Sequence, residues 1–82
     1  MMYEDANKPI YDYSKLDGRI TEKFGTYGKF AEVLGKTRQH VSRIMNNKSY
    51  LDVDEIETWV ETLELEVRDI PIYFFTHKVH ET

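Results

Sequence analysis

The sequence predicts an all-α domain, a compact bundle of about five short helices. Apolar residues recur three and four positions apart along four successive segments, and Gly, Pro, Ser, Thr or Asp stands at the segment boundaries. A chain of 82 residues with 40% hydrophobic and 32% charged residues suits one small globular unit with a modest core. Because residues 1–12 show no helical or strand period, we expect a loosely ordered arm there and a single domain over residues 13–82.

Two short helices are predicted between residues 14 and 34. Each begins at a hydroxyl residue that can cap it, Ser14 in the first and Thr26 in the second. Each ends at a glycine, Gly25 and Gly35, because glycine readily adopts the positive φ of a tight turn. The apolar stripes are Leu16, Ile20 and Phe24 in the first helix and Tyr27, Phe30, Ala31 and Leu34 in the second.

A third helix, over about residues 37–47, is expected after a very short turn, with Thr37 as its cap. One side of it is apolar, with Val41, Ile44 and Met45. The opposite arc carries Arg38, Gln39, Ser42, Arg43 and Asn46. Two short helices joined by a turn containing Gly, the second with a basic and amide-bearing outer face, are typical of a helix-turn-helix.

The C-terminal part predicts a fourth and a fifth helix. Asp52 is a suitable cap with Glu55 at the capping-box position. The apolar stripe that follows is Ile56, Trp59, Val60 and Leu63. Pro71 suits the first turn of a short last helix, although residues 72–79 would also serve as a strand. We therefore expect a helix around Pro71.

Charge is unevenly distributed along a chain whose net charge is −4. Between Lys15 and Lys48 there are eight Lys and Arg residues against three Asp and Glu, a net charge of +5. Between Asp52 and Asp69 there are eight acids against one base, a net charge of −7. The two halves are therefore expected to face different surroundings.

The third helix has the composition of a reader of DNA. An α-helix fits the major groove, where Arg can pair with guanine and Gln with adenine. The base-reading candidates are Arg38, Gln39, Ser42 and Arg43. Basic side chains and backbone amides at helix N-termini can hold phosphates, which indicates Lys36, Thr37 and Lys48.

Residues 26–48, "TYGKFAEVLGKTRQHVSRIMNNK", resemble the helix-turn-helix of the Cro/C1-type phage repressor superfamily. The flanking "YSKLDGRITEKFG" and "YFFTHKV" resemble small Cro-like or repressor-like proteins of phages and prophages of Gram-positive bacteria. The resemblance implies a lambda-repressor-like domain that binds operator DNA as a dimer and represses transcription. It also implies that Asn46 approaches a phosphate. Tyr27 stands where the family commonly has Gln, and its hydroxyl would reach a phosphate instead.

Other functions find less support. The chain has no Cys, which excludes disulfides, thiolate zinc sites and cysteine nucleophiles. His77 and His80 make a poor metal set, and His40 is expected to be solvent-exposed or next to a phosphate. No cluster of catalytic residues is visible, so we expect neither an enzyme nor a cofactor or small-molecule substrate. With no signal peptide or membrane span in the sequence, a cytoplasmic location is expected.

Two functions remain in competition. The leading prediction is a sequence-specific regulator of transcription, a phage or prophage repressor, that binds double-stranded operator DNA. We expect it to act as a homodimer on DNA, because one short helix buries too little DNA surface for tight binding. The alternative is a protein-interaction module that uses the same fold to bind another regulator.

Overall fold

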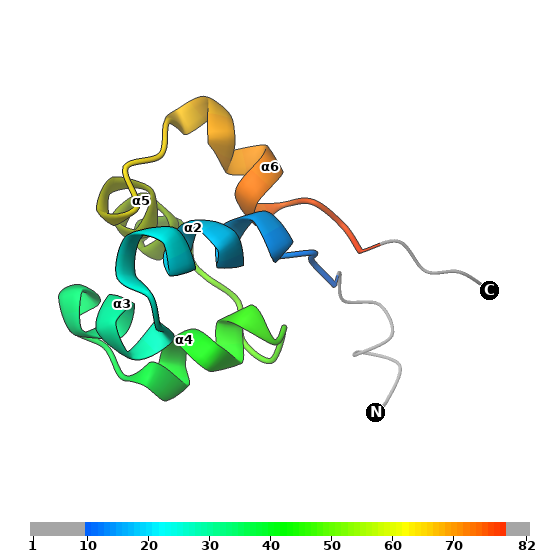
Figure 1. The fold of residues 1–82 in the computed structure, drawn as a ribbon. Coiled ribbons are helices and arrows are strands. Elements are labelled where there is room, and N and C mark those ends of the chain that lie inside the picture. Colours follow the sequence, from blue (N-terminus) through cyan, green and yellow to red (C-terminus); the bar gives the residue numbers. More distant parts are fainter. Residues whose placement is uncertain (1–9, 79–82) are drawn as a thin grey trace.

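The computed structural model describes residues 10–78, which fold into five α-helices and one 3-10 turn (Figure 1). These elements are α2 (Ser14–Phe24), α3 (Tyr27–Leu34), α4 (Arg38–Met45), α5 (Val53–Thr62), η1 (Val67–Asp69) and α6 (Ile70–Phe74). The prediction of an all-α bundle of about five short helices is confirmed.

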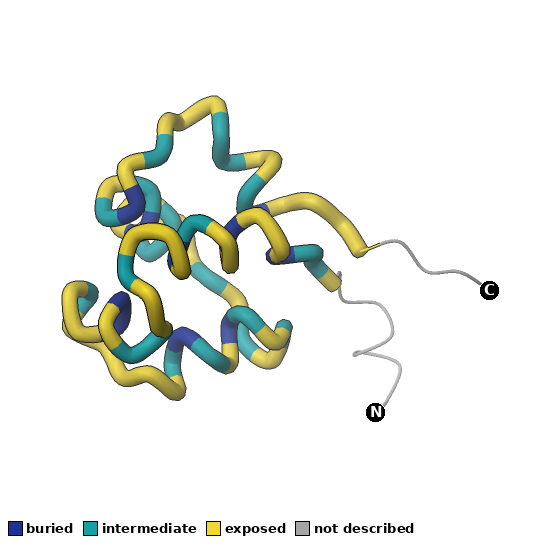
Figure 2. The backbone as a smooth tube through the Cα atoms, viewed as in Figure 1, coloured by how far each residue is buried: buried dark blue, intermediate teal, exposed yellow. Residues whose placement is uncertain are grey.

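The core lies where the helices meet. Helix α3 packs against α2, α4 and α5, while α6 packs against α2. The buried hydrophobic side chains come from the predicted stripes, with one from the N-terminal segment and one from α6. They are Tyr13, Leu16, Ile20, Phe30, Ala31, Val41, Ile44, Trp59, Leu63 and Phe74. In Figure 2 the buried positions follow the inward sides of the helices, and the exposed ones lie outside.

Most of the predicted helix boundaries are confirmed. The side chains of Thr26, Thr37 and Asp52 each accept a hydrogen bond from the backbone N–H three residues on, at 3.2, 3.1 and 2.8 Å. Gly25 and Gly35 have φ values of 85° and 74°, which few other residues adopt without strain. The short turn between α3 and α4 therefore depends on Gly35 and on the Thr37 cap.

The start of α2 differs from the prediction. Ser14 is the first helical residue rather than the cap, and the capping position falls on Tyr13. No side chain caps α2; instead, the Asp12 carboxylate accepts from the Ser14 backbone N–H at 2.9 Å and from the Ser14 hydroxyl at 2.5 Å. These two hydrogen bonds lower the pKa of the Asp12 carboxyl.

Residues 10–12 are tied to the C-terminal part of the domain and to Asn47. The Asn47 side chain accepts from the Tyr11 backbone N–H at 2.9 Å and donates to the Tyr11 carbonyl at 3.0 Å. Tyr11 also pairs with His77 in an isolated antiparallel bridge. The loosely ordered arm expected over residues 1–12 therefore does not include residues 10–12, and residues 1–9 lie outside the described residues.

Replacing Asn47 by Gly should destabilise the domain by about 1–3 kcal/mol, because it removes two half-buried hydrogen bonds. Asn47 has a φ of 60°, which Gly also adopts, so the backbone itself should not be strained. The measurement is urea unfolding. The control is Lys48→Gly, which adds the same backbone flexibility at the next residue and removes no side-chain hydrogen bond in the described structure. Equal losses in the two variants would mean that the bonds to Tyr11 contribute nothing.

The sequence left open whether residues 72–79 form a helix or a strand, and the described part of this segment contains both a helical turn and extended backbone. Residues 70–74 form α6, with Pro71 in its first turn as predicted, and Phe74 is buried. Beyond Phe75 the chain becomes extended and reaches the bridge at His77. The helix ends because the Phe75 N–H closes the last turn, and the following backbone pairs with residues 10–12.

Basic side chains of α2 hold the end of α5. Arg19 donates to the carbonyls of Leu63 and Glu64 at 2.9 and 3.2 Å, which satisfies acceptors left free at a helix C-terminus. Lys23 pairs with the Glu64 carboxylate at 2.6 Å. The hydrogen bond and charge of Lys23 lower the pKa of Glu64 below its usual value of 4.5.

Because this pKa is lower in the folded state, the Lys23–Glu64 pair should stabilise the domain above pH 4.5 and lose its effect as the pH falls further. Glu64→Gln should therefore be less stable than the unchanged chain at pH 7 and equally stable at pH 3. Urea unfolding at both values measures the difference. In a Lys23→Met background the difference at pH 7 should shrink, and an undiminished difference would assign it to another contact.

Candidate functional site

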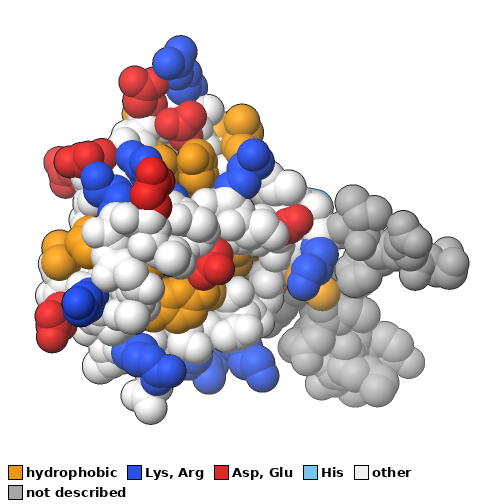
Figure 3. Space-filling view, viewed as in Figure 1, with side chains coloured by type: hydrophobic (Ala, Val, Ile, Leu, Met, Phe, Trp, Pro, Cys, Tyr) orange, Lys and Arg blue, Asp and Glu red, His pale blue; other side chains and the backbone are white. Residues whose placement is uncertain are grey.

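Helix α4 has the two faces that the sequence predicts. Val41 and Ile44 are fully buried, whereas Arg38, Gln39 and Arg43 are exposed. In Figure 3, Lys and Arg side chains line the lower edge of the molecule, where α4 lies in Figure 1. The α-helix ends at residue 45 rather than near residue 47, because the chain turns at residue 47 with a positive φ.

The four base-reading candidates differ in exposure and in their hydrogen bonds within the chain. Arg38 and Gln39 lie side by side at the exposed N-terminal end of α4. Arg43 instead bends toward the turn that follows α4, donating to the Ser49 hydroxyl at 3.2 Å and to the Lys48 carbonyl at 3.4 Å. Ser42 is half-buried. Local hydrogen bonds therefore hold part of the face that was expected to read bases.

Three of the five phosphate candidates also have partners within the chain. Tyr27 donates from its hydroxyl to Asp17 at 2.6 Å, and burial together with this hydrogen bond raises the pKa of Tyr27 to about 12. Thr37 caps α4, and Asn46 donates to the Ser42 carbonyl at 2.8 Å. An anionic carboxylate beside Tyr27 opposes the approach of a phosphate.

The other two phosphate candidates, Lys36 and Lys48, are exposed at opposite ends of α4. Lys48 lines a hollow of about 530 Å³ that contains two further bases, Arg43 and Lys78. Lys36 lies in the turn before α4, next to α5. The structure therefore separates these two ammonium groups and gives each a different neighbourhood.

A contact that the sequence did not predict joins α4 to α5. His40 Nε2 lies 2.5 Å from Glu55 Oε2, and both side chains are partly buried. His40 is therefore half-buried rather than solvent-exposed as expected. The two residues are 15 positions apart on different helices, so no periodic spacing in the sequence indicated the pair.

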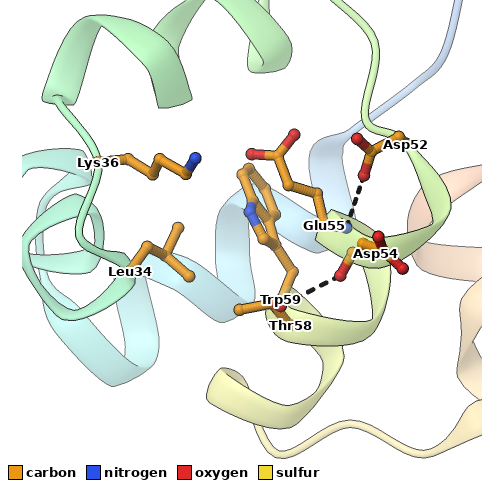
Figure 4. Close-up of a pocket in the computed structure, with 7 residues that line it drawn as sticks. All are labelled: Leu34, Lys36, Asp52, Asp54, Glu55, Thr58 and Trp59. Atoms are coloured by element: carbon orange, nitrogen blue, oxygen red, sulfur yellow. Dashed lines mark hydrogen bonds between the residues drawn. The ribbon is translucent and has the colours of Figure 1, made fainter.

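Figure 4 shows a hollow between the α3–α4 turn and the start of α5, with a volume of about 320 Å³. Leu34 and Lys36 form one side, and Glu55 and Trp59 face them. The lining residues are Leu34, Lys36, Asp52, Asp54, Glu55, Thr58 and Trp59. Within the described residues the buried indole N–H of Trp59 has no hydrogen-bond partner. Three carboxylates against one ammonium group make the hollow anionic overall.

Residues 10–78 contain neither a metal-binding cluster nor a membrane-spanning helix. No group of three or more His, Cys, Asp or Glu side chains in that range could hold a metal ion. Of His77 and His80, which the sequence indicated to be a poor metal set, His80 lies outside the described residues. None of the helices in the described part is long and apolar enough to cross a membrane.

Comparisons with known proteins assign the chain to a protein family. The chain belongs to the family described as "Protein of unknown function (DUF739)", whose profile matches residues 10–77. A solved structure of the modulator of repression (MOR) of the temperate bacteriophage TP901-1 from Lactococcus lactis matches with 50% identity and a TM-score of 0.73. The match covers 85% of this chain and 95% of that one. A comparison with curated proteins found no match.

These findings correct the leading functional prediction. The phage protein that shares half of its aligned residues with this chain is a modulator of repression, not a repressor. The expectation of an operator-binding repressor is therefore wrong. The expectation that a homodimer binds operator DNA as its direct partner is wrong as well. The match supports the coarser expectation of regulation connected with repression in phages. The matched family is DUF739 rather than the Cro/C1-type superfamily, and the protein-interaction alternative fits better.

Proposed function

We propose that this protein modulates repression by binding another regulatory protein. The observation that carries the proposal is the 50% identity, over 85% of the chain, to a phage modulator of repression. A protein of this size can change the action of a repressor by covering part of its surface or by holding it in one state. Both modes require a protein interface rather than a base-reading helix.

The surface chemistry supports this proposal. The hydrogen bonds of Tyr27 and Arg43 occupy groups that a DNA reader would leave free for the duplex. The acidic stretch from Asp52 to Asp69 repels a polyanion and favours a protein with basic groups. The helix-turn-helix arrangement does not oppose this function, because one fold supports many functions.

The proposal includes no catalytic step and places the protein in the bacterial cytoplasm, where phage regulators act. In the hollow beside α5, carboxylates face a lysine, but its lining has no nucleophile paired with a base. The contact between His40 and Glu55 joins two helices and is only partly exposed. A role in packing α4 against α5 accounts for it without chemistry.

A two-hybrid screen of the chain against every helix-turn-helix regulator encoded in its own genome tests the proposal. We expect one regulator to interact and to bind the purified chain in calorimetry with a Kd of micromolar or tighter, about −8 kcal/mol. A pool of random DNA duplexes serves as the parallel probe. Binding to no regulator, together with enrichment of one DNA sequence by the chain alone, would overturn the proposal.

A further inference from the structure

Another hollow lies along α5, between this helix and the η1–α6 segment. Its volume is about 500 Å³. Its lining residues are Glu57, Thr58, Val60, Glu61, Leu65, Val67 and Ile70. We call this hollow the α5–α6 groove. Four of the seven lining residues are aliphatic, and two are carboxylates contributed by α5.

The aliphatic side of the groove has apolar surface without a partner in the described structure. Val60, Leu65 and Ile70 are half-buried and pack against the core, while part of each side chain also lines the groove. Val67 is 78% exposed, more than any other large hydrophobic residue described. Apolar side chains gathered in a hollow with polar residues at its edge are typical of a protein interaction site.

The carboxylates of the groove are unpaired in the described part of the chain. Glu57 and Glu61 are one helical turn apart and exposed, and no hydrogen bond or ion pair there involves either side chain. By contrast, Glu55, Glu64 and Glu66 each pair with a basic side chain. Like charges four residues apart destabilise a helix slightly, so the arrangement is better explained by a cationic partner than by the fold.

We propose that the α5–α6 groove binds a basic amphipathic helix of a partner protein. The apolar side of that helix would cover Val67 and its aliphatic neighbours, and its Lys or Arg residues would pair with Glu57 and Glu61. Two carboxylates about 5–6 Å apart along α5 match basic side chains spaced one turn apart on the partner. The inference rests on the proposed function and adds where the partner binds and with what chemistry.

A defined probe tests the chemistry directly. It is a helical peptide of about 16 residues made of Leu and Lys, with Leu at positions i, i+3, i+4 and i+7. In NMR spectra of the labelled protein, amide shifts should gather at Val60, Glu61, Leu65 and Val67. The same peptide with Glu in place of Lys, and a scrambled Leu and Lys peptide, should leave these amides unchanged. Shifts spread over all acidic residues, or equal for the scrambled peptide, would overturn the inference.

Variants separate the charge from the apolar contact. Glu57→Gln with Glu61→Gln should weaken the Leu and Lys peptide about tenfold, while Glu22→Gln with Glu32→Gln, which removes the same charge elsewhere, should leave its Kd within about twofold. Val67→Ser should weaken it about tenfold, with Val33→Ser on α3 as the control. Val67 and Val33 are 78% and 62% exposed, so both variants should keep the melting temperature.

The same variants are then measured against the regulator found in the two-hybrid screen. If that regulator binds every variant equally, the groove assignment is wrong and the proposed function stands. If no regulator binds but the peptide occupies the groove, the proposed function is wrong and the groove stands as a site for basic helices. Concentration-dependent self-association that Val67→Ser abolishes would show that a second copy of the chain covers the groove, and would overturn the inference.

Discussion

Phe30→Asp should leave the chain without a cooperative unfolding transition at 25 °C. Phe30 is fully buried, and its ring contacts Trp59 edge-on with the ring centroids 4.9 Å apart. Losing this side chain costs about 3–5 kcal/mol, and burying an unpaired carboxylate costs several more. The sum is comparable to the whole stability of a small domain, about 5–15 kcal/mol.

Circular dichroism during a thermal ramp measures this effect. Val33→Asp is the matched control, because Val33 lies on the same helix and is 62% exposed. The control should melt within a few degrees of the unchanged chain, since surface substitutions rarely change stability by more than about 0.5 kcal/mol. A normal melting transition for Phe30→Asp would mean that α3 does not pack as described.

Trp59→Ala should cost about 3–5 kcal/mol, the second largest effect expected. Trp59 is fully buried between Phe30 and Phe74, with ring centroids at 4.9 and 6.3 Å. Its removal opens a cavity where α3, α5 and α6 meet. Urea unfolding followed by circular dichroism measures the loss of free energy.

Trp59→Phe separates packing from hydrogen bonding. In the described structure the indole N–H is buried without a partner, so the change to Phe sacrifices no hydrogen bond. Removing an unsatisfied donor offsets part of the cost of the smaller ring. We expect Trp59→Phe to lower the free energy of unfolding by less than about 2 kcal/mol. A loss equal to that of Trp59→Ala would indicate that the indole nitrogen has a partner in solution.

The sequence predicted the helices well because their signals are local. The caps Thr26, Thr37 and Asp52 act on amides three residues away, and Gly25 and Gly35 meet a requirement of their own backbone. The buried stripes follow the helical period for the same reason. A pattern within one turn of helix is enough to fix such features.

Two of the missed features depend on residues far apart in the sequence. Asn47 binds the backbone of Tyr11, 36 residues away, and this contact orders residues 10–12. His40 meets Glu55 only because α4 and α5 pack together. The early start of α2 has a local cause, because the Asp12 carboxylate binds both the backbone N–H and the hydroxyl of Ser14.

The functional prediction was wrong for a different reason. The basic arc of α4 exists, but its residues are consistent with either a DNA contact or a solvated face. Whether Tyr27 and Arg43 are free depends on Asp17, on Ser49 and on how their helices are placed. The same fold serves both DNA readers and protein-binding modules, and the similarity to a modulator of repression favours the second.

The most direct test of regulator binding without operator binding is fluorescence anisotropy of a labelled operator duplex. The duplex carries the operator sequence of the regulator identified in the screen. The regulator is titrated into it at about 150 mM salt, once without and once with this protein. We expect this protein alone to leave the anisotropy unchanged and to shift the regulator's binding curve when added. Sequence-specific binding of the duplex by this protein alone, with an unshifted regulator curve, would contradict a modulator that acts through protein contact.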